Sequence, residues 1–238
     1  MSIIGILRKA ADYTKGDSPA TKLRRKRFLI FKSLIVLLPR PLSILDVGGT
    51  QIFWERMDFT EEPDVKIVLL NLSKVEVYHK NFISVQGDAR SLDAFNDQEF
   101  DVVFSNSVIE HVGGYYQQCQ MANEVKRVGK SYFIQTPNRF FPIEPHFLLP
   151  FFQFLPLGLK IFLVRHFDIG WHKRTPDKQK AAQLVNSIRL LTEKELKKLF
   201  PGANIYKEKL FGLTKSLIVY EGWDGDTLSI KKEKNKNY

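Results

Sequence analysis

Short apolar runs, rich in β-branched and aromatic residues, recur along the chain and stop at polar turn residues. Runs of this kind are typical of buried strands, and the segments between them are long enough for helices or crossovers. Strands that alternate with helices predict an α/β protein with a doubly wound, mostly parallel sheet. The predicted strands span residues 44–47, 66–70, 82–86, 100–104 and 130–135.

The last part of the chain predicts an antiparallel end to the same sheet. Thr192 and Glu195 have the spacing of a capping box, which should open a helix that ends near Pro201. Residues 204–210 and 215–220 then predict two strands joined by a turn over residues 211–214.

Length and composition favour a single domain over residues 1–226. Within it we expect a basic, helical amino-terminal segment over residues 1–40 and an insertion or lid over residues 138–190. The lysine-rich end, residues 227–238, has the composition of a disordered tail. The single cysteine, Cys119, excludes an internal disulfide, and its helical spacing from apolar neighbours predicts a core-facing side chain.

Four of the predicted strands lead into a polar residue at the carboxyl end: Asp46, Asn71, Asp88 and Asn106. In a doubly wound sheet, ligands bind in the crevice beyond the carboxyl ends of the strands. We therefore expect these four side chains to converge on one binding crevice.

The first strand end continues into Gly48, Gly49 and Thr50. A glycine turn before a helix lets a ligand approach the backbone closely, which is typical of nucleotide-type cofactor sites. The spacing is not the dinucleotide fingerprint, because Thr50 and Phe53 stand where glycines would be needed. The alternative is an ordinary strand-to-helix turn without a ligand.

Three of these segments together resemble a class I S-adenosylmethionine-dependent methyltransferase of the Methyltransferase-11/UbiG-like group. Residues 45–50 (LDVGGT) resemble the first family motif, residues 86–89 (QGDA) the third and residues 100–112 (FDVVFSNSVIEHV) the fourth. The resemblance covers roughly residues 42–137, with a return near 192–221. It implies a Rossmann-like methyltransferase fold, enzymatic activity and S-adenosyl-L-methionine as the cofactor.

The resemblance also implies how the cofactor would be held. The glycine turn would cradle its methionine part, the second strand end would bind the ribose, and the third motif would bind the adenine amino group. With the remaining strand ends, the predicted cofactor-binding residues are Asp46, Gly48, Gly49, Thr50, Asn71, Asp88, Ala89 and Asn106.

Some positions depart from the family pattern. Thr50 and Ile52 replace further glycines of the first motif, and Asn71 replaces the usual acid at the second strand end. A carboxylate accepts two hydroxyl hydrogen bonds whereas an amide offers one acceptor, so we expect Asn71 to hold a ribose less tightly. These departures keep open the alternative of a non-catalytic protein on a methyltransferase scaffold.

The formal net charge is +10, and a dense basic cluster precedes apolar residues 28–38, which suit a helix. Its members are Lys22, Arg24, Arg25, Lys26 and Arg27. One interpretation is a helix that caps the sheet with a solvated basic first turn, and the other is a contact with an anionic membrane surface. The charge also favours a nucleic-acid methyltransferase, but the chain carries no recognised RNA or DNA module.

A second unusual region, residues 138–167, holds eight of the 19 phenylalanines and is interrupted by prolines. Its proline-free apolar stretches are much shorter than the ~20 residues that cross a bilayer. Basic residues follow up to position 174. The combination suits an interfacial membrane patch, an apolar acceptor pocket beside an anionic group, or a hydrophobic lid packed on the sheet.

Candidate acceptor chemistry lies in two short segments, Glu110-His111 after the fourth strand and Glu144-Pro-His146 after the fifth. Both border the predicted crevice, so the four side chains could meet there. Histidine can take a proton from an acceptor hydroxyl near neutral pH while a carboxylate orients the ring, so we predict His111 or His146 as the general base. The alternative is that these side chains only satisfy hydrogen bonds of a helix end and a loop.

The same four residues could instead hold a divalent metal, as in resembling methyltransferases with a Glu-x-x-Glu-His motif. Ser107 occupies the first of those Glu positions, so we expect no metal.

Together, these observations predict methyl transfer from S-adenosylmethionine to an oxygen of a small or lipid-like acceptor. The first residues carry too short an apolar run for a signal peptide, so we expect a cytoplasmic protein that can associate with a membrane surface.

Overall fold

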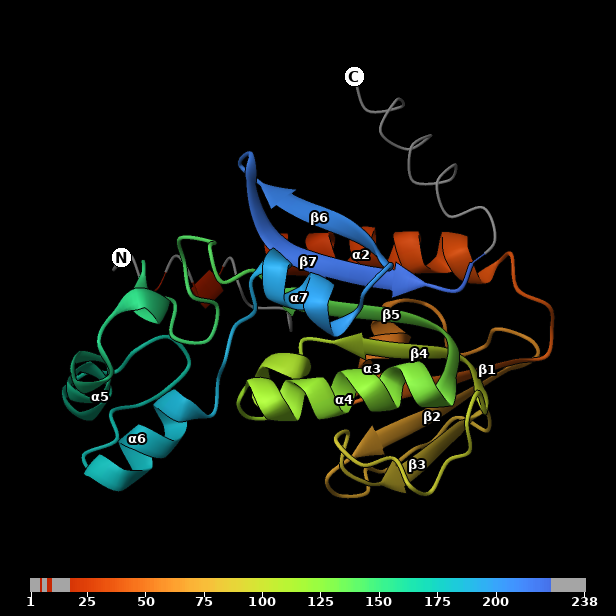
Figure 1. Ribbon diagram of the computed structural model, residues 1–238, viewed down its shortest axis with the longest axis horizontal. Coiled ribbons are helices and arrows are strands. Elements are labelled where there is room, and N and C mark those ends of the chain that lie inside the picture. The colour runs from red at the N-terminus through yellow and green to blue at the C-terminus, as the bar shows by residue number, and fades with distance from the viewer. Residues whose placement is uncertain (1–4, 6–7, 10–17, 224–238) are drawn as a thin grey trace.

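Seven strands form one mixed sheet in the order β3-β2-β1-β4-β5-β7-β6 (Figure 1). The computed structural model describes residues 5, 8–9 and 18–223. Neighbouring strands pair in parallel among β1 (Leu42–Val47), β2 (Val65–Asn71), β3 (Phe82–Gln86), β4 (Phe100–Asn106) and β5 (Gly129–Pro137). β7 (Leu213–Glu221) pairs antiparallel with β5 and with β6 (Asn204–Leu210). The predicted Rossmann-like sheet with a carboxyl-terminal antiparallel pair is confirmed, whereas the predicted tail, 227–238, lies outside the described residues.

The terminal hairpin turns more tightly than the sequence pattern predicts. Its turn consists of Phe211 and Gly212, so β7 begins at Leu213 and not at Lys215. Both turn residues have positive φ, 50° and 77°. This is the backbone of a two-residue turn whose twist matches that of the flanking strands. The four-residue turn predicted over 211–214 is therefore wrong.

Helices cover both faces of the sheet (Figure 1). α2 (Pro19–Ile35) and α3 (Gln51–Arg56) pack on one face around an aromatic core centred on the fully buried Trp54. α4 (Tyr115–Val128) and α7 (Glu193–Leu199) cover the other face.

The sequence predicts a capping box at the start of α7 and a core-facing cysteine, Cys119, and both are observed. At the start of α7, Thr192 Oγ1 accepts from the Glu195 amide at 3.2 Å, and Glu195 Oε2 accepts from the Thr192 amide at 2.9 Å. The capping box is therefore confirmed. Cys119 lies on α4, partly buried against the core of the sheet.

Residues 138–190 form a lobe beside the sheet rather than a layer on either face (Figure 1). This lobe, called the insertion below, contains η2 (Phe152–Phe154), α5 (Leu157–His166) and α6 (Lys178–Asn186). It has a small core of its own, made by Phe147, Phe152, Val164, Ile169, Ala181 and Val185. Within the described residues, no helix combines the length and apolarity needed to cross a bilayer.

The basic cluster on α2 divides into exposed and buried members. Its exposed members are Lys22, Arg25 and Lys26. Arg27 is buried, pairs with the buried Glu208 of β6 at 3.0 Å and donates a hydrogen bond to the Asn106 side chain. The expectation of a solvated basic turn is therefore wrong for Arg27. Its position on α2 faces the sheet, where two acceptors compensate for the loss of hydration.

Candidate functional site

The glycine turn after β1 rests on a buried carboxylate. Asp46 is 1% exposed and accepts a hydrogen bond from Trp54 Nε1 at 2.7 Å. A Cβ at Gly49 would lie 1.6 Å from Asp46 Oδ2, and a Cβ at Gly48, where φ is +74°, would lie 2.5 Å from a methyl of Val108. Packing beneath the turn therefore requires both glycines. The structure corrects the expectation that the Asp46 carboxylate itself lines the crevice, because it supports the turn from below.

The outer side of the same turn is open. Thr50 is exposed, and its hydroxyl makes no capping bond to α3. Asn71 Nδ2 donates to the Gly49 carbonyl at 2.9 Å, so the amide oxygen of Asn71 is the group left to accept from a ligand. The next residue, Leu72, exposes 75% of its surface. Polar groups beside an exposed apolar side chain fit the methionine and nucleoside parts of S-adenosylmethionine.

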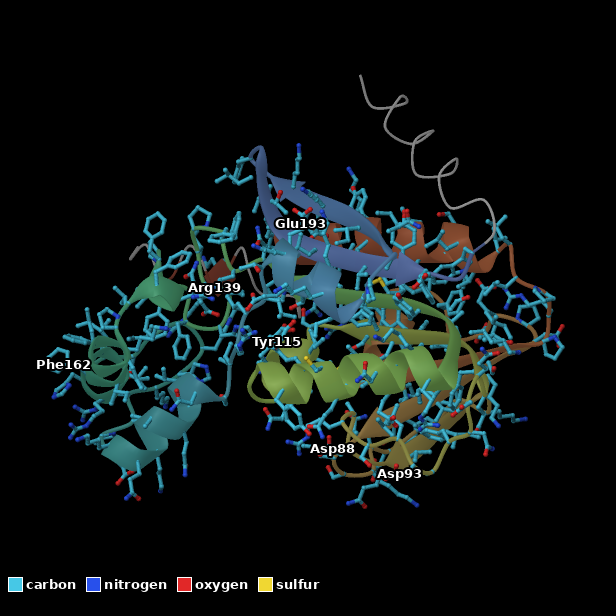
Figure 2. All side chains as sticks on the ribbon, in the orientation of Figure 1. Asp88, Asp93, Tyr115, Arg139, Phe162 and Glu193 are labelled. Atoms are coloured by element: carbon cyan, nitrogen blue, oxygen red, sulfur yellow. The ribbon has the colours of Figure 1, made fainter. Side chains whose placement is uncertain are left out.

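Asp88 lies at the end of the neighbouring strand, on the edge of the molecule (Figure 2). Its carboxylate accepts from Arg90 Nε at 2.9 Å and from Arg90 Nη2 at 2.5 Å. These hydrogen bonds lower the pKa of Asp88, so it is ionised at neutral pH. A carboxylate has about four acceptor positions, so an amino group can bind Asp88 beside Arg90. Ala89 is buried against the core.

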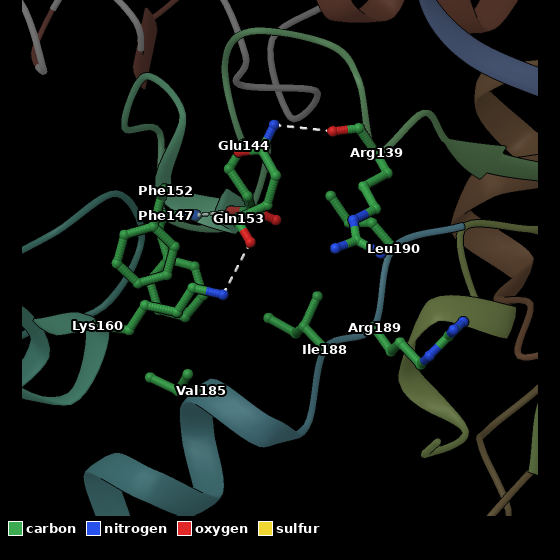
Figure 3. Close-up of a pocket in the computed structure, with 10 residues that line it drawn as sticks. All are labelled: Arg139, Glu144, Phe147, Phe152, Gln153, Lys160, Val185, Ile188, Arg189 and Leu190. Carbon is green, nitrogen blue, oxygen red and sulfur yellow. Dashed lines mark hydrogen bonds between the residues drawn. The ribbon is translucent and has the colours of Figure 1, made fainter. Parts of the chain in front are cut away.

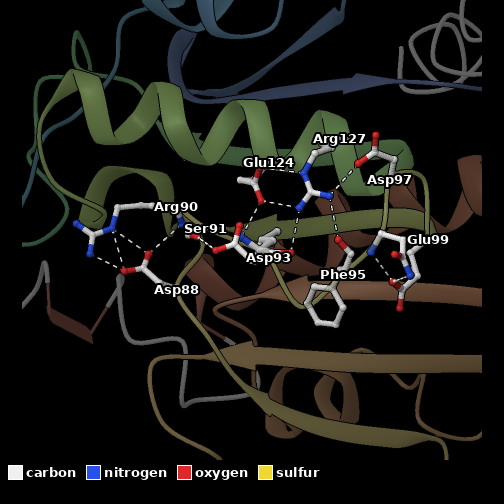
Figure 4. Close-up of polar contacts among 11 residues, drawn as sticks. Asp88, Arg90, Ser91, Asp93, Phe95, Asp97, Glu99, Glu124 and Arg127 are labelled. Carbon is white, nitrogen blue, oxygen red and sulfur yellow. Dashed lines mark hydrogen bonds and ion pairs between the residues drawn. The ribbon is translucent and has the colours of Figure 1, made fainter.

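Arg127 of α4 holds the segment that follows Asp88 (Figure 4). Its guanidinium donates to the Phe95 carbonyl at 2.9 Å, to Asp97 at 2.9 Å and to Glu124 at 2.8 Å. No helix forms between β3 and β4. These bonds therefore take the place of helix packing in fixing the loop that carries Asp88.

Asn106, the remaining strand-end residue, is already engaged. Its Oδ1 accepts from Arg27, so its amide protons are the groups left for a ligand. The next residue, Ser107, has a φ of 60° and donates to Gln135 Oε1 at 2.8 Å. The chain therefore turns sharply out of β4 into η1 (Ile109–His111).

The four candidate catalytic side chains meet at this edge of the sheet, as their placement in the sequence predicts. The rings of His111 and His146 pack edge to face with centroids 4.8 Å apart. His146 Nδ1 lies 2.6 Å from Glu144 Oε1. Glu110 approaches the same cluster from η1.

Glu110 and His111 lie on a 3₁₀ turn between β4 and α4. Gly113, with a φ of +119°, and Gly114, the N-cap of α4, separate the two elements. A positive φ is easily adopted by glycine and ends the helical path between them.

Glu144 anchors this cluster from the insertion. It is 2% exposed, and its Oε2 accepts from the backbone amides of His146 at 2.8 Å and Phe147 at 2.6 Å. Its Oε1 accepts a hydrogen bond from His146 Nδ1 at 2.6 Å, which assigns the ring proton to Nδ1. The ring is therefore fixed, with Nε2 as its proton acceptor.

Burial and neighbouring charges set the protonation of the cluster. Burial raises the pKa of Glu110 to about 7. Desolvation by surrounding protein atoms, together with the charge of His146, lowers the pKa of His111 to about 4, although its side chain reaches the surface. Burial also acts to lower the pKa of His146, but the hydrogen bond and charge of Glu144, with the charge of Glu110, outweigh it and raise that pKa.

The cluster has the donor set of a metal site. Glu110, His111 and His146 each offer one ligand atom within 4.8 Å of the others. Among the described residues, Glu110 Oε1 has no hydrogen-bond partner, while its Oε2 accepts from Thr136 at 3.0 Å. Imidazole and carboxylate ligands suit a divalent cation, and Glu144 would then orient the ligand His146 through the hydrogen bond to its Nδ1.

Sequence reasoning missed the residues that join the cluster to the insertion. Gln118 of α4 is buried and donates to the carbonyls of Ile109 at 3.0 Å and Arg189 at 2.8 Å. Arg189 returns a hydrogen bond to Gln118 at 2.7 Å, and its backbone amide donates to the Glu110 carbonyl at 2.8 Å. The sequence does contain one indication of this contact, a glutamine on the apolar face of a helix, because a buried amide group requires hydrogen-bond partners.

The central part of the chain is similar to known proteins. Residues 55–132 match the sequence model of a family described as Methyltransferase domain. Two uncharacterized proteins of Mycobacterium tuberculosis are 38% identical over 60 residues, which are 25% of this chain and 20% of each relative. The match thus spans about a fifth of the length of these curated relatives.

Solved structures with a similar fold include the CurJ carbon methyltransferase. It is 15% identical, with a TM-score of 0.55, and the alignment covers 91% of this chain and 58% of that one. A methyltransferase from Aquifex aeolicus described as SAM-dependent is 13% identical, with a TM-score of 0.47 over 80% of this chain and 87% of that one. The CurJ similarity shows that the fold is that of a methyltransferase.

We predict that Asp46→Asn and Glu110→Gln each weaken the dependence of stability on pH. Burial raises both pKa values to about 7, from ordinary values of 3.8 and 4.5. The folded protein therefore binds more protons than the unfolded chain between about pH 4 and pH 7, so wild-type stability falls as the pH rises through this interval. The substituted amides cannot ionise, so each variant should lose the part of this pH dependence that its carboxyl group contributes. Urea unfolding at about pH 4, 6 and 8 measures the effect.

Glu61→Gln is the matched control, because Glu61 is exposed. It should leave the pH dependence of the wild type unchanged. Parallel pH dependences in the wild type and in both buried-site variants would contradict the raised pKa values.

Proposed function

We propose that this chain, a class I S-adenosylmethionine-dependent methyltransferase by its fold and its matched segment, transfers a methyl group to an oxygen of a small or lipid-like acceptor. The observation that carries the proposal is the pairing of His146 Nδ1 with the buried Glu144 carboxylate at 2.6 Å. A base held in this way serves a nucleophile that carries a proton, as a hydroxyl does.

The crevice residues have separate tasks in holding the cofactor. Thr50 and the backbone of the glycine turn would bind the methionine part, Asn71 the ribose, and Asp88 the adenine amino group. Asp46 supports the glycine turn from below, and Arg27 holds the Asn106 side chain. When bound, the cofactor supplies an electrophilic methyl group on a positively charged sulfur.

The acceptor's proton goes to His146 Nε2. Glu144 keeps the ring in place and stabilises the imidazolium that forms. His111 has a pKa of about 4, is neutral at pH 7 and packs edge to face against His146, which limits rotation of that ring. Alignment of the acceptor, and exclusion of water by the insertion, contribute the rest of the rate enhancement.

We predict that Asp88→Ala weakens S-adenosylhomocysteine binding. The substitution removes the acceptor for the adenine amino group, which should cost about 1–3 kcal/mol. Asp93→Ala is the control, since Asp93 is exposed and lies in the same loop (Figure 4). Isothermal titration measures both, and equal affinity of Asp88→Ala and the wild type would remove the assignment.

Asn71→Asp checks the ribose contact separately. If Asn71 is a weaker ribose ligand than an acid, the substitution should tighten S-adenosylhomocysteine binding or leave it equal. A loss of affinity would show that the amide protons, which reach the Gly49 carbonyl, matter more than the second acceptor oxygen.

We predict that His146→Ala lowers methyl transfer about 100-fold or more, because a positioned general base contributes about 10²–10⁴-fold. S-adenosylhomocysteine affinity should be spared. His111→Ala should have a smaller effect, since His111 supports the neighbouring ring. Release of S-adenosylhomocysteine with a panel of hydroxylated acceptors measures turnover.

His166→Ala is the control for these variants, because His166 is exposed on α5. Full turnover in both His111→Ala and His146→Ala would contradict a base in this cluster. Activity that is lost with a chelator and restored by a divalent cation would assign Glu110, His111 and His146 to a metal instead.

We also propose that the protein makes peripheral contact with an anionic membrane. The insertion exposes large apolar side chains, among them Phe162 at its outer end (Figure 2). The full exposed set is Phe140, Phe151, Phe154, Leu157, Leu159, Phe162, Phe167 and Trp171. Exposed Lys173 and Arg174 adjoin them.

Binding to anionic vesicles should therefore weaken with salt and fall in a Phe151→Ser, Phe162→Ser double variant. Co-sedimentation with anionic and neutral vesicles measures it. Equal recovery in the supernatant with both kinds of vesicle would exclude the membrane contact.

A further inference from the structure

A cavity of about 260 Å³ lies within the insertion, lined by residues of its first part, 139–160, and of its last part, 185–190 (Figure 3). Its apolar wall consists of Phe147, Phe152, Val185, Ile188 and Leu190. Small-molecule pockets occupy about 300–1,000 Å³, so this cavity suits a small ligand or one end of a larger one.

Two cations extend into this space from opposite sides, Arg139 and Lys160 (Figure 3). In the part of the chain that the structure describes, Lys160 Nζ donates to the Gln153 carbonyl at 2.9 Å, and the Arg139 guanidinium has neither a hydrogen bond nor an ion pair. Burial lowers the pKa of Lys160, and the charge of Arg139 lowers it further. The two charges therefore repel each other in a partly desolvated space, and a bound anion would relieve that repulsion.

The other charged groups of the cavity already have partners. Arg189 donates to Gln118 at 2.7 Å and to Glu195 at 2.5 Å. Glu144 accepts from His146 and from two backbone amides. The charge of Glu144 acts to raise the pKa of Lys160, but burial and the charge of Arg139 outweigh it and lower that pKa. Among the described residues Arg139 has no acidic partner, so the cavity presents two positive charges beside an apolar wall.

The cavity shares one wall residue, Glu144, with the proposed catalytic cluster. Glu144 lines the cavity and also holds His146. On the opposite wall, the backbone amide of Arg189 donates to the Glu110 carbonyl. A ligand in the cavity would therefore lie one side chain, that of Glu144, away from the candidate base.

We propose that this cavity binds the acidic end of an apolar methyl acceptor, a carboxylate or a phosphate ester, between Arg139 and Lys160. The proposal rests on the methyl transfer proposed above and specifies its substrate class. The apolar wall favours an acid with a hydrocarbon body over a free inorganic anion. Gln153, whose buried Oε1 has no partner among the described residues, can accept from a donor on the same ligand.

Calorimetric titration of the full chain with four probes tests this site: octanoate, octyl phosphate, octanol and inorganic phosphate. At least one of the two acids should bind at least about tenfold more tightly than octanol and inorganic phosphate, because a charged hydrogen bond contributes about that much. The tighter acid identifies the anionic group. Equally tight binding of octanol or of inorganic phosphate would overturn the proposal.

Variants locate the site. Arg139→Gln and Lys160→Met should each weaken acid binding by about tenfold or more, whereas Lys178→Met, at an exposed lysine of α6, should not. Undiminished acid binding in both cavity variants would contradict the assignment.

Titration of the same samples with S-adenosylhomocysteine separates the two proposals. Acid binding without S-adenosylhomocysteine binding would support the anion site and remove the methyl-transfer function. S-adenosylhomocysteine binding without acid binding would overturn the anion site alone.

Discussion

One buried carboxylate, that of Glu144, determines how the candidate site is arranged. Its oxygens accept from two consecutive backbone amides and from His146 Nδ1, so they fix the path of the chain and the direction of one ring. The same side chain forms part of the cavity wall. A buried carboxylate requires such donors, because burial removes the hydrogen bonds that water would supply. The base, the rim of the insertion and the cavity therefore depend on one set of hydrogen bonds.

The opposite side of the crevice obeys a different constraint. Gly48 and Gly49 are required by Val108 and by the buried Asp46, before any ligand is considered. Asn106 is tied to Arg27, which in turn balances Glu208. The strand ends are therefore held by contacts within the protein, and outward-facing atoms of Thr50, Asn71 and Asp88 are left for the proposed cofactor contacts. This separation explains how the turn keeps its shape although Thr50 and Ile52 replace glycines.

The sequence predicts the sheet well because its strands are short apolar runs that end at polar residues, and β3 has the predicted bounds of 82–86. It also predicts that Glu110, His111, Glu144 and His146 meet, since both segments follow neighbouring parallel strands. It does not predict that Arg27 is buried, because the acceptors Glu208 and Asn106 come from distant strands. For the same reason it cannot pair Arg139 with Lys160, which only the folding of the insertion brings to one cavity.

The central claim is that Glu144 holds His146 as a proton acceptor. The most direct measurement is an NMR titration of the His146 ring in the wild type and in Glu144→Gln, with His146→Ala used to assign the signal. The account predicts a wild-type pKa above the ordinary value of 6.5 and a lower pKa in Glu144→Gln, whose neutral amide cannot stabilise the imidazolium equally. A wild-type pKa below 6.5, or the same pKa in both proteins, would contradict it.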